Sequence, residues 1–193
     1  MKIFNSINIP KNYKASALAI GNFDGIHRGH QKVFEETRKF AKRKKIKFGV
    51  FTFTPLPVMF FYKNIKNFRL TSEDQKIKLF KKHQVDFVIN IKFNKNFSKI
   101  SAEDFIKKII YKKMNPQLLS VSNNFRFGRK RKGDVNLLKK FSNKCAYRLL
   151  NITPLKYSGK MISSTRIRKC LKNGDINSAN KLLSRTWFID GQV

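Results

Sequence analysis

The chain has 193 residues, of which 41% are hydrophobic and 19 are phenylalanine, so it is long and apolar enough to bury a core and a disordered chain is excluded. Lys and Arg number 43 against 11 Asp and Glu, which gives a formal net charge of +32. Such a charge attracts polyanions, but the basic residues are spread along the whole chain, so we interpret it as compositional drift and expect no nucleic-acid partner.

The cysteines and the apolar runs bound the cellular setting. Cys145 and Cys170 lie far apart and form no CxxC pair, which argues against a zinc site and against a disulfide framework. The N-terminus has no secretory pattern, and no apolar run approaches membrane-spanning length. We therefore expect a cytoplasmic protein without membrane contact, and the sequence indicates no oligomeric state.

Apolar runs rich in β-branched and aromatic residues alternate with amphipathic, Lys-rich stretches. The expected elements are, in chain order, a strand over 16–23, a helix over 29–43, a strand over 48–53, a helix over 71–82, a strand over 85–91, a helix capped by Ser101, a strand over 118–122, a helix over 135–141, a strand over 147–150, and helices over 164–173 and 177–183. This alternation predicts an α/β fold with a parallel sheet covered by helices on both faces.

The stretch "GNFDGIHRGHQ" connects the first predicted strand to the first predicted helix. Gly21 and Gly25 allow a tight turn there, and Gly29 lets a bulky anion approach the first helical turn. Free N–H groups and the helix dipole favour negative charge at such a position, which in an open parallel sheet lies at the ligand-binding edge. The stretch therefore predicts a phosphate site.

His27 and His30 are one helical turn apart and are expected to face that phosphate together. A bound phosphate raises the pKa of an imidazole, so we expect cationic histidines that stabilise developing negative charge. A metal centre is disfavoured because His83, the remaining histidine, is distant in sequence. The alternative interpretation is that the two rings only pack against the protein or lie on a solvated surface.

A second cluster stands in "KMISSTRIR". Ser163, Ser164 and Thr165 offer hydroxyls and backbone N–H groups at a helix start, and Arg168 can bind two phosphate oxygens. The chain has no GxxxxGK(S/T) loop and no GxGxxG fingerprint, which leaves the HxGH type of enzyme that attacks the α-phosphate of a nucleoside triphosphate. The second cluster would hold the departing pyrophosphate, although alone it could be a helix cap with a solvated basic face.

Several segments together carry a family resemblance. They are "GNFDGIHRGHQ", the Pro55 to Pro57 loop after "VFTF", "RLTSEDQK", "VSNNFRFGRKRKGDV", "ISSTRIR" and "GDINSANKLLSRTWFIDGQV". In these segments the chain resembles the adenylyltransferase module of bacterial bifunctional riboflavin kinase/FAD synthetases. The resemblance implies a Rossmann-like nucleotidyltransferase fold of the HxGH type, with a small insert, over residues 1–185. It also implies that residues 186–193 begin a riboflavin kinase domain whose remainder is absent from this chain.

The resemblance also implies two sets of binding residues. For ATP they are Gly21, Phe23, Asp24, Gly25, His27, Gly29, His30, Ser163, Ser164, Thr165 and Arg168, and for FMN they are Pro55, Pro57, Asn124, Phe125, Arg126 and Gly128. The chain departs from the family pattern at Leu56, where His is common, at Ser122, where Gly is common, and at Asn124, where Asp is common. Asn124 keeps an amide that can orient a phosphate or a ribityl hydroxyl.

The implied reaction joins FMN to ATP and gives FAD and pyrophosphate. FMN carries an ionised phosphate at neutral pH, so the reaction needs alignment and charge neutralisation rather than a general base. His27, His30, Asn124 and Arg168 are the expected catalytic residues. Mg2+ is expected on the triphosphate oxygens, and Asp24 is open to three roles: a metal ligand, a nucleotide-orienting residue or a cap of the turn.

Three other functions remain open on the sequence. The first is another HxGH transferase, acting on nicotinamide mononucleotide, phosphopantetheine or glycerol phosphate. The second is an RNA-binding protein, because HxGH with "KMISS" is similar to the paired signatures of class I aminoacyl-tRNA synthetases, although the chain is short for such an enzyme. The third is a module that binds flavin and nucleotide without turnover.

Overall fold

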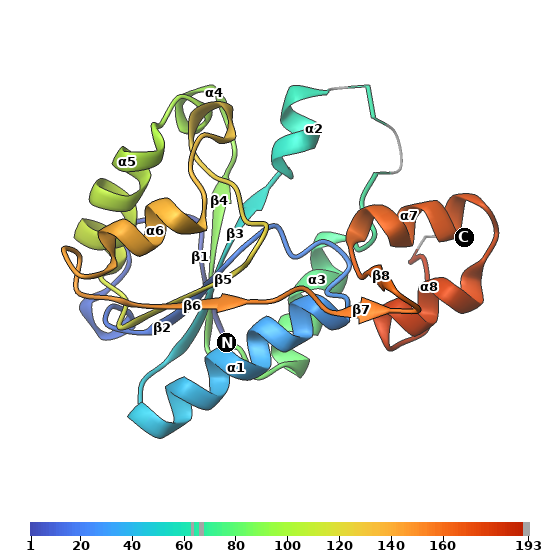
Figure 1. The fold of residues 1–193 in the computed structure, drawn as a ribbon, viewed down its shortest axis with the longest axis horizontal. Helices are drawn as coiled ribbons and strands as arrows, with labels where there is room; N and C mark the ends of the chain where they lie inside the picture. Colours follow the sequence, from blue (N-terminus) through green and yellow to red (C-terminus); the bar gives the residue numbers. More distant parts are fainter. Residues whose placement is uncertain (63, 66–67, 191–193) are drawn as a thin grey trace.

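A computed structural model describes residues 1–62, 64–65 and 68–190. Its main sheet has six strands in the order β1-β4-β3-β2-β5-β6, and every pair in it is parallel (Figure 1). The strands are β1 (Lys2–Phe4), β2 (Ala17–Ile20), β3 (Phe48–Thr54), β4 (Phe87–Lys92), β5 (Leu118–Ser122) and β6 (Arg148–Ile152). A separate antiparallel hairpin is formed by β7 (Lys156–Tyr157) and β8 (Lys160–Met161).

The helices follow the strands in the expected alternation. They are η1 (Lys11–Tyr13), α1 (Arg28–Lys44), α2 (Pro57–Phe61), α3 (Glu73–Lys82), α4 (Lys95–Ser98), α5 (Ala102–Asp104), the π-helix η2 (Phe105–Met114), η3 (Arg129–Arg131), α6 (Val135–Ser142), α7 (Ser164–Lys172) and α8 (Ile176–Leu183). The expected α/β class with a parallel sheet is confirmed.

The centre of the sheet is β2, which pairs with β3 on one side and β5 on the other. All four of its residues are buried, which explains why the sequence there is an unbroken apolar run. The chain adds strands outward from β2 first in one direction and then in the other. A ligand crevice forms at such a reversal, beyond the carboxyl ends of the strands, and the loop after β2 enters it.

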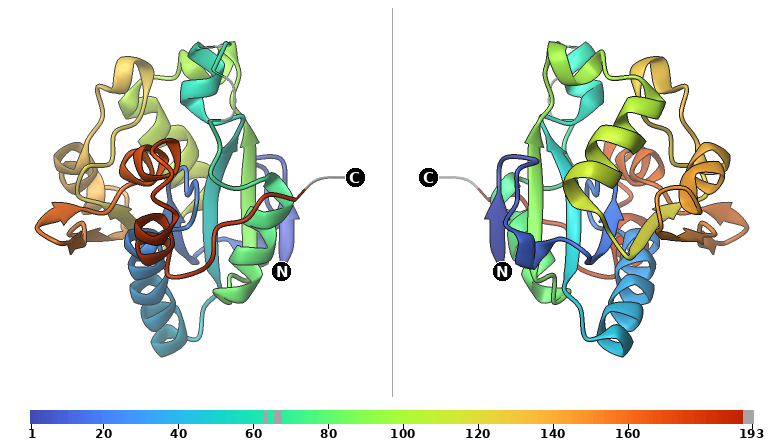
Figure 2. Two further views of the ribbon diagram at one scale, coloured as in Figure 1. Left: turned by 90° about the vertical axis from the view of Figure 1, so that its right-hand side faces the viewer. Right: turned by 90° about the vertical axis from the view of Figure 1, so that its left-hand side faces the viewer.

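Helices cover both faces of the sheet, as Figures 1 and 2 show. On one face α1 and α3 bury Phe34 and Phe80 against the sheet. On the other face η2 and α6 bury Ile106 and Leu138 in the larger core cluster. The ends of α1 and α3 follow the sequence closely. Ser72 and Gln75 form a capping box, and the helix begins at Glu73 rather than at Thr71.

The last two helices make a third cluster beside the sheet, at the right-hand end of Figure 1. Ile167, Leu182 and Leu183 are fully buried in it. The side chain of Gln31 on α1 donates to the carbonyl of Leu183 at 2.9 Å and accepts from the Ser184 hydroxyl at 2.8 Å. These bonds hold the α7–α8 pair next to the start of α1.

Two features at the chain ends need separate mention. The strand β1 was not expected, because Lys2–Phe4 is a short, largely exposed edge segment. Residues 186–190, at the other end of the chain, run beside α3 and form no strand. There the side-chain amide of Gln75 donates to the backbone carbonyl of Phe188 at 3.3 Å. Residues 191–193 lie outside the described part of the chain, so the expectation of a second domain there stays a prediction.

Candidate functional site

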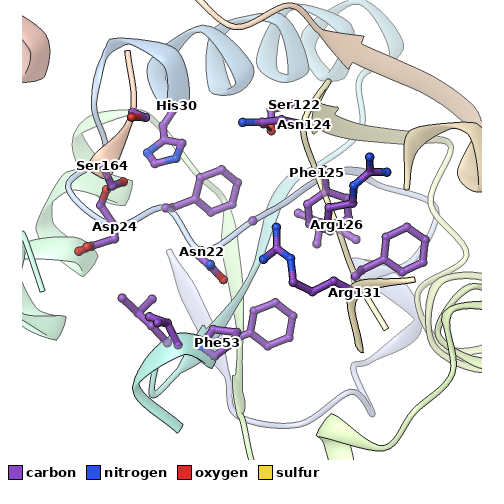
Figure 3. Close-up of a pocket in the computed structure, with 18 of the residues that line it drawn as sticks. Asn22, Asp24, His30, Phe53, Ser122, Asn124, Phe125, Arg126, Arg131 and Ser164 are labelled. Atoms are coloured by element: carbon purple, nitrogen blue, oxygen red, sulfur yellow. Dashed lines mark hydrogen bonds between the residues drawn. The ribbon is translucent and has the colours of Figure 1, made fainter. Parts of the chain in front are cut away.

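A cavity of about 1120 Å³ lies at the carboxyl edge of the sheet (Figure 3). The last residues of β2 and β5, Ile20 and Ser122, line it together with the neighbouring ends of β3 and β6. Four stretches supply its wall: the corner after β2, the α2 segment after β3, the loop after β5, and the start of α7. The crevice expected from the strand order is therefore a real cavity, and the sequence motifs surround it.

The corner after β2 is strained and firmly held. Phe23, Gly25 and Ile26 all adopt positive φ values, of 49°, 79° and 39°, which is unusual for a bulky and for a β-branched side chain. A Cβ at Gly25 would lie 2.8 Å from Leu70 Cδ1. The backbone N–H of Leu70 donates to Asp24 Oδ1 at 2.9 Å, which fixes the corner to the segment before α3. Gly21, to which we also assigned the turn, has no positive φ.

His27 and His30 stack on each other, with ring centroids 3.6 Å apart and planes at 17°. Both line the cavity, and the His30 ring also makes an edge contact with Phe23. His27 is the N-cap of α1, because its Nδ1 accepts a hydrogen bond from the backbone N–H of His30 at 3.3 Å. A Cβ at Gly29 would lie 3.1 Å from the His27 ring, so this glycine makes room for the imidazole as well as for an approaching anion.

The protein surroundings favour neutral forms of both imidazoles. Burial lowers the pKa of His27 to about 4, and the cations Arg185 and Arg168 act in the same direction. Burial also lowers the pKa of His30 well below its usual value, and His27 adds to this effect. These directions come from the protein groups alone, whereas the cationic histidines were expected next to a bound phosphate. The negative charge of a phosphate would have to raise both pKa values for the imidazoles to become protonated.

The start of α7 meets the corner directly. The Ser164 hydroxyl donates to the backbone carbonyl of Asp24 at 2.8 Å, and Arg168 Nη2 donates to Asp24 Oδ2 at 2.5 Å. Ser163 caps α7 by accepting from the backbone N–H of Arg166 at 3.2 Å, and Thr165 is exposed at the cavity wall. The two clusters that the sequence singled out therefore face one cavity.

Asp24 and Arg168 hold the site together. Asp24 is 4% exposed, and its two carboxylate oxygens accept from Leu70 and from Arg168. Of the three roles left open for Asp24, the contacts support the cap of the turn. Arg168 also donates through Nε to the carbonyl of Phe68 at 2.7 Å and stacks over the Phe68 ring. Within the described ranges only its Nη1 lacks a protein partner, so less than the full fork remains for a phosphate.

The loop after β5 brings most of the predicted flavin residues to the cavity. From this loop, Asn124, Phe125, Arg126 and Gly128 line it. Pro57, the first residue of α2, also lines it. The side-chain oxygen of Asn124, Oδ1, accepts a hydrogen bond from the Ser122 hydroxyl at 2.8 Å. Arg126 forms an ion pair with Asp134 at 2.8 Å. Pro55 and Gly25 do not line the cavity, so the structure gives them no direct place in the site.

Sequence reasoning missed an aromatic wall on the same side. Phe53, Phe93, Phe97, Phe105 and Phe127 line the cavity and pack edge-on or tilted against one another. Leu56, which stands where the family often has His, is buried and also lines the cavity. In a chain with 19 phenylalanines no single Phe stands out, and these come from distant segments.

A buried lysine beneath the corner was also missed. Lys76 on α3 is 3% exposed, and its Nζ donates to Thr52 Oγ1 at 2.9 Å. The Thr52 hydroxyl in turn donates to the carbonyl of Asn22 at 3.2 Å, in the corner itself. Burial lowers the pKa of Lys76 to about 8. The sequence predicted this helix, but nothing in it marked this lysine as a core residue.

The described part of the chain offers neither a metal-binding cluster nor a membrane-spanning helix. No group of three or more His, Cys, Asp or Glu side chains gathers in a way that could hold a metal ion. None of the described helices has the length and apolar character needed to cross a lipid bilayer.

Comparison with known proteins adds the family. The model of the FAD synthetase family matches residues 9–166. A bifunctional riboflavin kinase/FMN adenylyltransferase of Buchnera aphidicola subsp. Schizaphis graminum is 40% identical over 195 residues, which cover 100% of this chain and 62% of the relative. The protein of the same description from Escherichia coli is 31% identical over 176 residues, covering 91% of this chain and 56% of the relative. The chain thus spans less than two thirds of the length of these relatives.

A solved structure shares the fold. The crystal structure described as a macrolide-efflux protein from Streptococcus pneumoniae matches with a TM-score of 0.82 at 24% identity, over 95% of this chain and 59% of that one. At this identity the likeness concerns the fold alone. The family match covers the corner, the β5 loop and the start of α7, which are the parts that build the cavity. On this match, the chain belongs to the FAD synthetase family.

Proposed function

We propose that this chain is an FMN adenylyltransferase, which transfers AMP from ATP to FMN and releases pyrophosphate. The family and the activity for which the relatives are named support the reaction. The observation that carries the proposal is the contact of Ser164 and Arg168 with Asp24, because it joins the HxGH corner and the hydroxyl-rich helix start at one cavity.

ATP would occupy the corner side of the cavity. His27 and His30 would donate hydrogen bonds to the α-phosphate, and Ser163, Ser164 and Thr165 would face the β- and γ-phosphates. His30 Nδ1 is buried without a hydrogen-bond partner among the described residues, which leaves a polar atom for a ligand to satisfy. Both imidazoles start neutral, so we expect a bound triphosphate to raise their affinity for a proton.

The chemical step needs no base from the protein. An oxygen of the FMN phosphate attacks the α-phosphorus, the new P–O bond forms, and the bond from the α-phosphorus to the bridging oxygen breaks as pyrophosphate leaves. Asn124 and the aromatic wall would orient the flavin. Catalysis then consists of alignment and of hydrogen bonds to the charge that develops on the α-phosphate.

Magnesium would enter with ATP. The residues offer no carboxylate cluster within the described ranges, and Asp24 uses both oxygens on protein donors. We therefore propose that triphosphate oxygens and water hold most of the coordination shell. A cytoplasmic location and the absence of a nucleic-acid partner stay predictions.

The test is incubation of the protein with ATP, magnesium and one acceptor at a time. We expect FAD and pyrophosphate with FMN, and neither with nicotinamide mononucleotide, phosphopantetheine or glycerol phosphate. Product from one of those acceptors and none from FMN would overturn the assignment of substrate. Flavin and nucleotide binding without pyrophosphate release would make the chain a binding module. Salt-sensitive RNA binding without flavin binding would favour the RNA-binding alternative, which is similar to aminoacyl-tRNA synthetases.

A further inference from the structure

The loop that follows β5 is clamped in place by backbone contacts. Phe127 and Gly133 exchange two backbone hydrogen bonds, at 3.1 and 2.9 Å, and Arg131 N–H donates to the carbonyl of Gly128 at 2.9 Å. A Cβ at Gly128 would lie 2.6 Å from the backbone of Ala102, so the loop is pressed against α5. This loop is therefore a fixed part of the cavity wall.

The clamped loop holds Arg131 in a strained conformation. Lys130 and Arg131 are consecutive non-glycine residues with positive φ values, of 54° and 57°. Such residues cost about 1 kcal/mol or more each and persist where the surrounding structure imposes them, often at ligand sites. In this backbone conformation the Arg131 side chain extends into the cavity in the direction of Asn22 (Figure 3).

Arg131 differs from two other guanidinium groups at the cavity. Arg126 pairs with Asp134, and Arg168 pairs with Asp24. Arg131 and its neighbour Arg129, which also lines the cavity, make no ion pair and no side-chain hydrogen bond within residues 1–62, 64–65 and 68–190. Of these two, Arg131 is the one that Figure 3 places in the cavity on the way to Asn22. A guanidinium presents five N–H donors in a planar fork that matches the oxygens of a phosphate.

The position of Arg131 selects among the phosphates that the cavity would hold. The triphosphate side is formed by the corner and α7, whereas Arg131 comes from the loop that carries Phe125 and Phe127. These two rings stack at 5.4 Å as part of the wall assigned to the flavin. The side chain thus reaches from the flavin wall toward the corner, which is the path that the phosphate of FMN must take to meet ATP.

We propose that Arg131 binds the phosphate of FMN and distinguishes FMN from riboflavin, an inference that rests on the proposed function. Riboflavin has the same ring and ribityl chain but no phosphate, so it would gain nothing from the guanidinium. Binding FMN next to ATP also brings two anionic phosphates together, and Arg131 would offset their repulsion.

The experiment measures equilibrium binding of FMN and of riboflavin by flavin fluorescence. It compares the unaltered chain with Arg131→Ala, Arg131→Lys and the control Lys132→Ala, the next residue, which is exposed and does not line the cavity. We expect Arg131→Ala to weaken FMN binding roughly 10- to 100-fold and to leave riboflavin binding unchanged. Arg131→Lys should recover part of the loss because it restores the charge without the fork, and Lys132→Ala should bind both flavins normally.

Two results would overturn the inference: unchanged FMN affinity in Arg131→Ala, or an equal loss for FMN and riboflavin. Thermal unfolding of each variant, together with the more conservative Arg131→Gln, separates a binding effect from a folding effect. FAD formation by the unaltered chain is measured in parallel. If the unaltered chain makes FAD and Arg131→Ala binds FMN normally, only the inference about Arg131 fails. If the unaltered chain makes no FAD but Arg131→Ala selectively loses FMN binding, the proposed reaction is rejected and the phosphate contact is retained.

Discussion

His27 combines three tasks in one side chain. Its Nδ1 caps α1, its ring stacks on His30, and both rings face the cavity. The cap needs an unprotonated Nδ1, and burial keeps it so by lowering the pKa of His27 to about 4. Helix start and candidate catalytic group are therefore coupled through one nitrogen.

This coupling makes stability depend on pH. Between about 4 and 6.5 the unfolded chain binds a proton at His27 that the folded chain does not, so the free energy of unfolding falls as pH decreases through this window. Across this window the free energy of unfolding should fall by about 3 kcal/mol through His27 alone. The lowered pKa of His30 acts in the same direction. Urea unfolding at pH 7 and pH 4.5 measures it. His27→Asn keeps a capping side chain that does not titrate, so its curve should be flatter, and an identical pH dependence would contradict the assignment.

Arg168 is predicted to be a structural residue as well as a ligand. Arg168→Ala leaves the carboxylate of Asp24 buried with one donor, from Leu70, and we expect it to lower the free energy of unfolding by about 3 kcal/mol or more. The control is Arg166→Ala on the same helix. Its guanidinium donates to two backbone carbonyls and forms no ion pair with a described carboxylate, so this variant should lose less stability.

The two roles of Arg168 separate experimentally. The double variant with Asp24→Asn should lose less stability than the sum of the single variants, because it removes the unpaired charge. At a temperature where Arg168→Ala remains folded, its KM for ATP should rise. An unchanged dependence on ATP concentration would remove Arg168 from the binding site and leave it a purely structural contact.

At the scale of elements, α3 supports the corner from below. Lys76 reaches the corner through Thr52, which links α3, β3 and the backbone of Asn22. Its ammonium lies near Glu73, Asp24 and Arg69 but forms no ion pair among the described residues. A buried charge with one hydrogen bond is costly for folding, so we expect it to be kept for the potential that it creates at the phosphate site.

The variant Lys76→Met tests whether the buried ammonium lowers stability while favouring phosphate binding. The unfolded chain keeps its proton up to about pH 10.5, whereas the folded chain loses it near pH 8, so stability of the unaltered chain should rise with pH across this window. The variant should lack that rise, gain about 1 kcal/mol or more at pH 7, and bind ATP less tightly. Chemical unfolding at pH 7 and pH 9.5 provides the measurement. A variant that is less stable at pH 7 would contradict the electrostatic account and make Lys76 a packing residue.

Elements with a strong local pattern could be predicted from the sequence. The strands β2 to β5 are dense apolar runs, and α1 and α3 have periodic faces and recognisable caps. The strand β1 escaped because its formation depends on pairing with β4, a contact between distant segments. Likewise α2 and α4 are short helices whose sequences carry no helical period.

The candidate site follows the same division. HxGH and ISSTRIR are local patterns, and both face the cavity. The partner of Asp24 lies 144 residues away, so the sequence left the role of that carboxylate open. The aromatic wall and the place of Arg131 at the cavity arise only when separate segments meet. The lowering of both imidazole pKa values by the protein itself could not be predicted, because burial, which causes it, is a tertiary property. The expected rise against a bound phosphate stays a prediction.

For the whole molecule, the net charge of +32 and the cavity have different consequences. The charge raises the local concentration of any polyanion, and this general attraction weakens with salt. Under the proposed function, selection of ATP and FMN would instead require the arrangement of the corner, the α7 start and the β5 loop around one cavity. The central claim is that these three parts act together on one triphosphate and one flavin.

Pyrophosphate release tests that claim most directly. With FMN, ATP and magnesium, the unaltered chain should release one pyrophosphate for each FAD formed. His30→Gln keeps most of the side-chain volume beside Phe23, so it should remain folded and lose about 10²-fold or more in turnover, as expected for removal of a preorganised donor. Turnover by His30→Gln close to that of the unaltered chain, or no pyrophosphate from the unaltered chain while FMN and ATP both bind, would contradict the account.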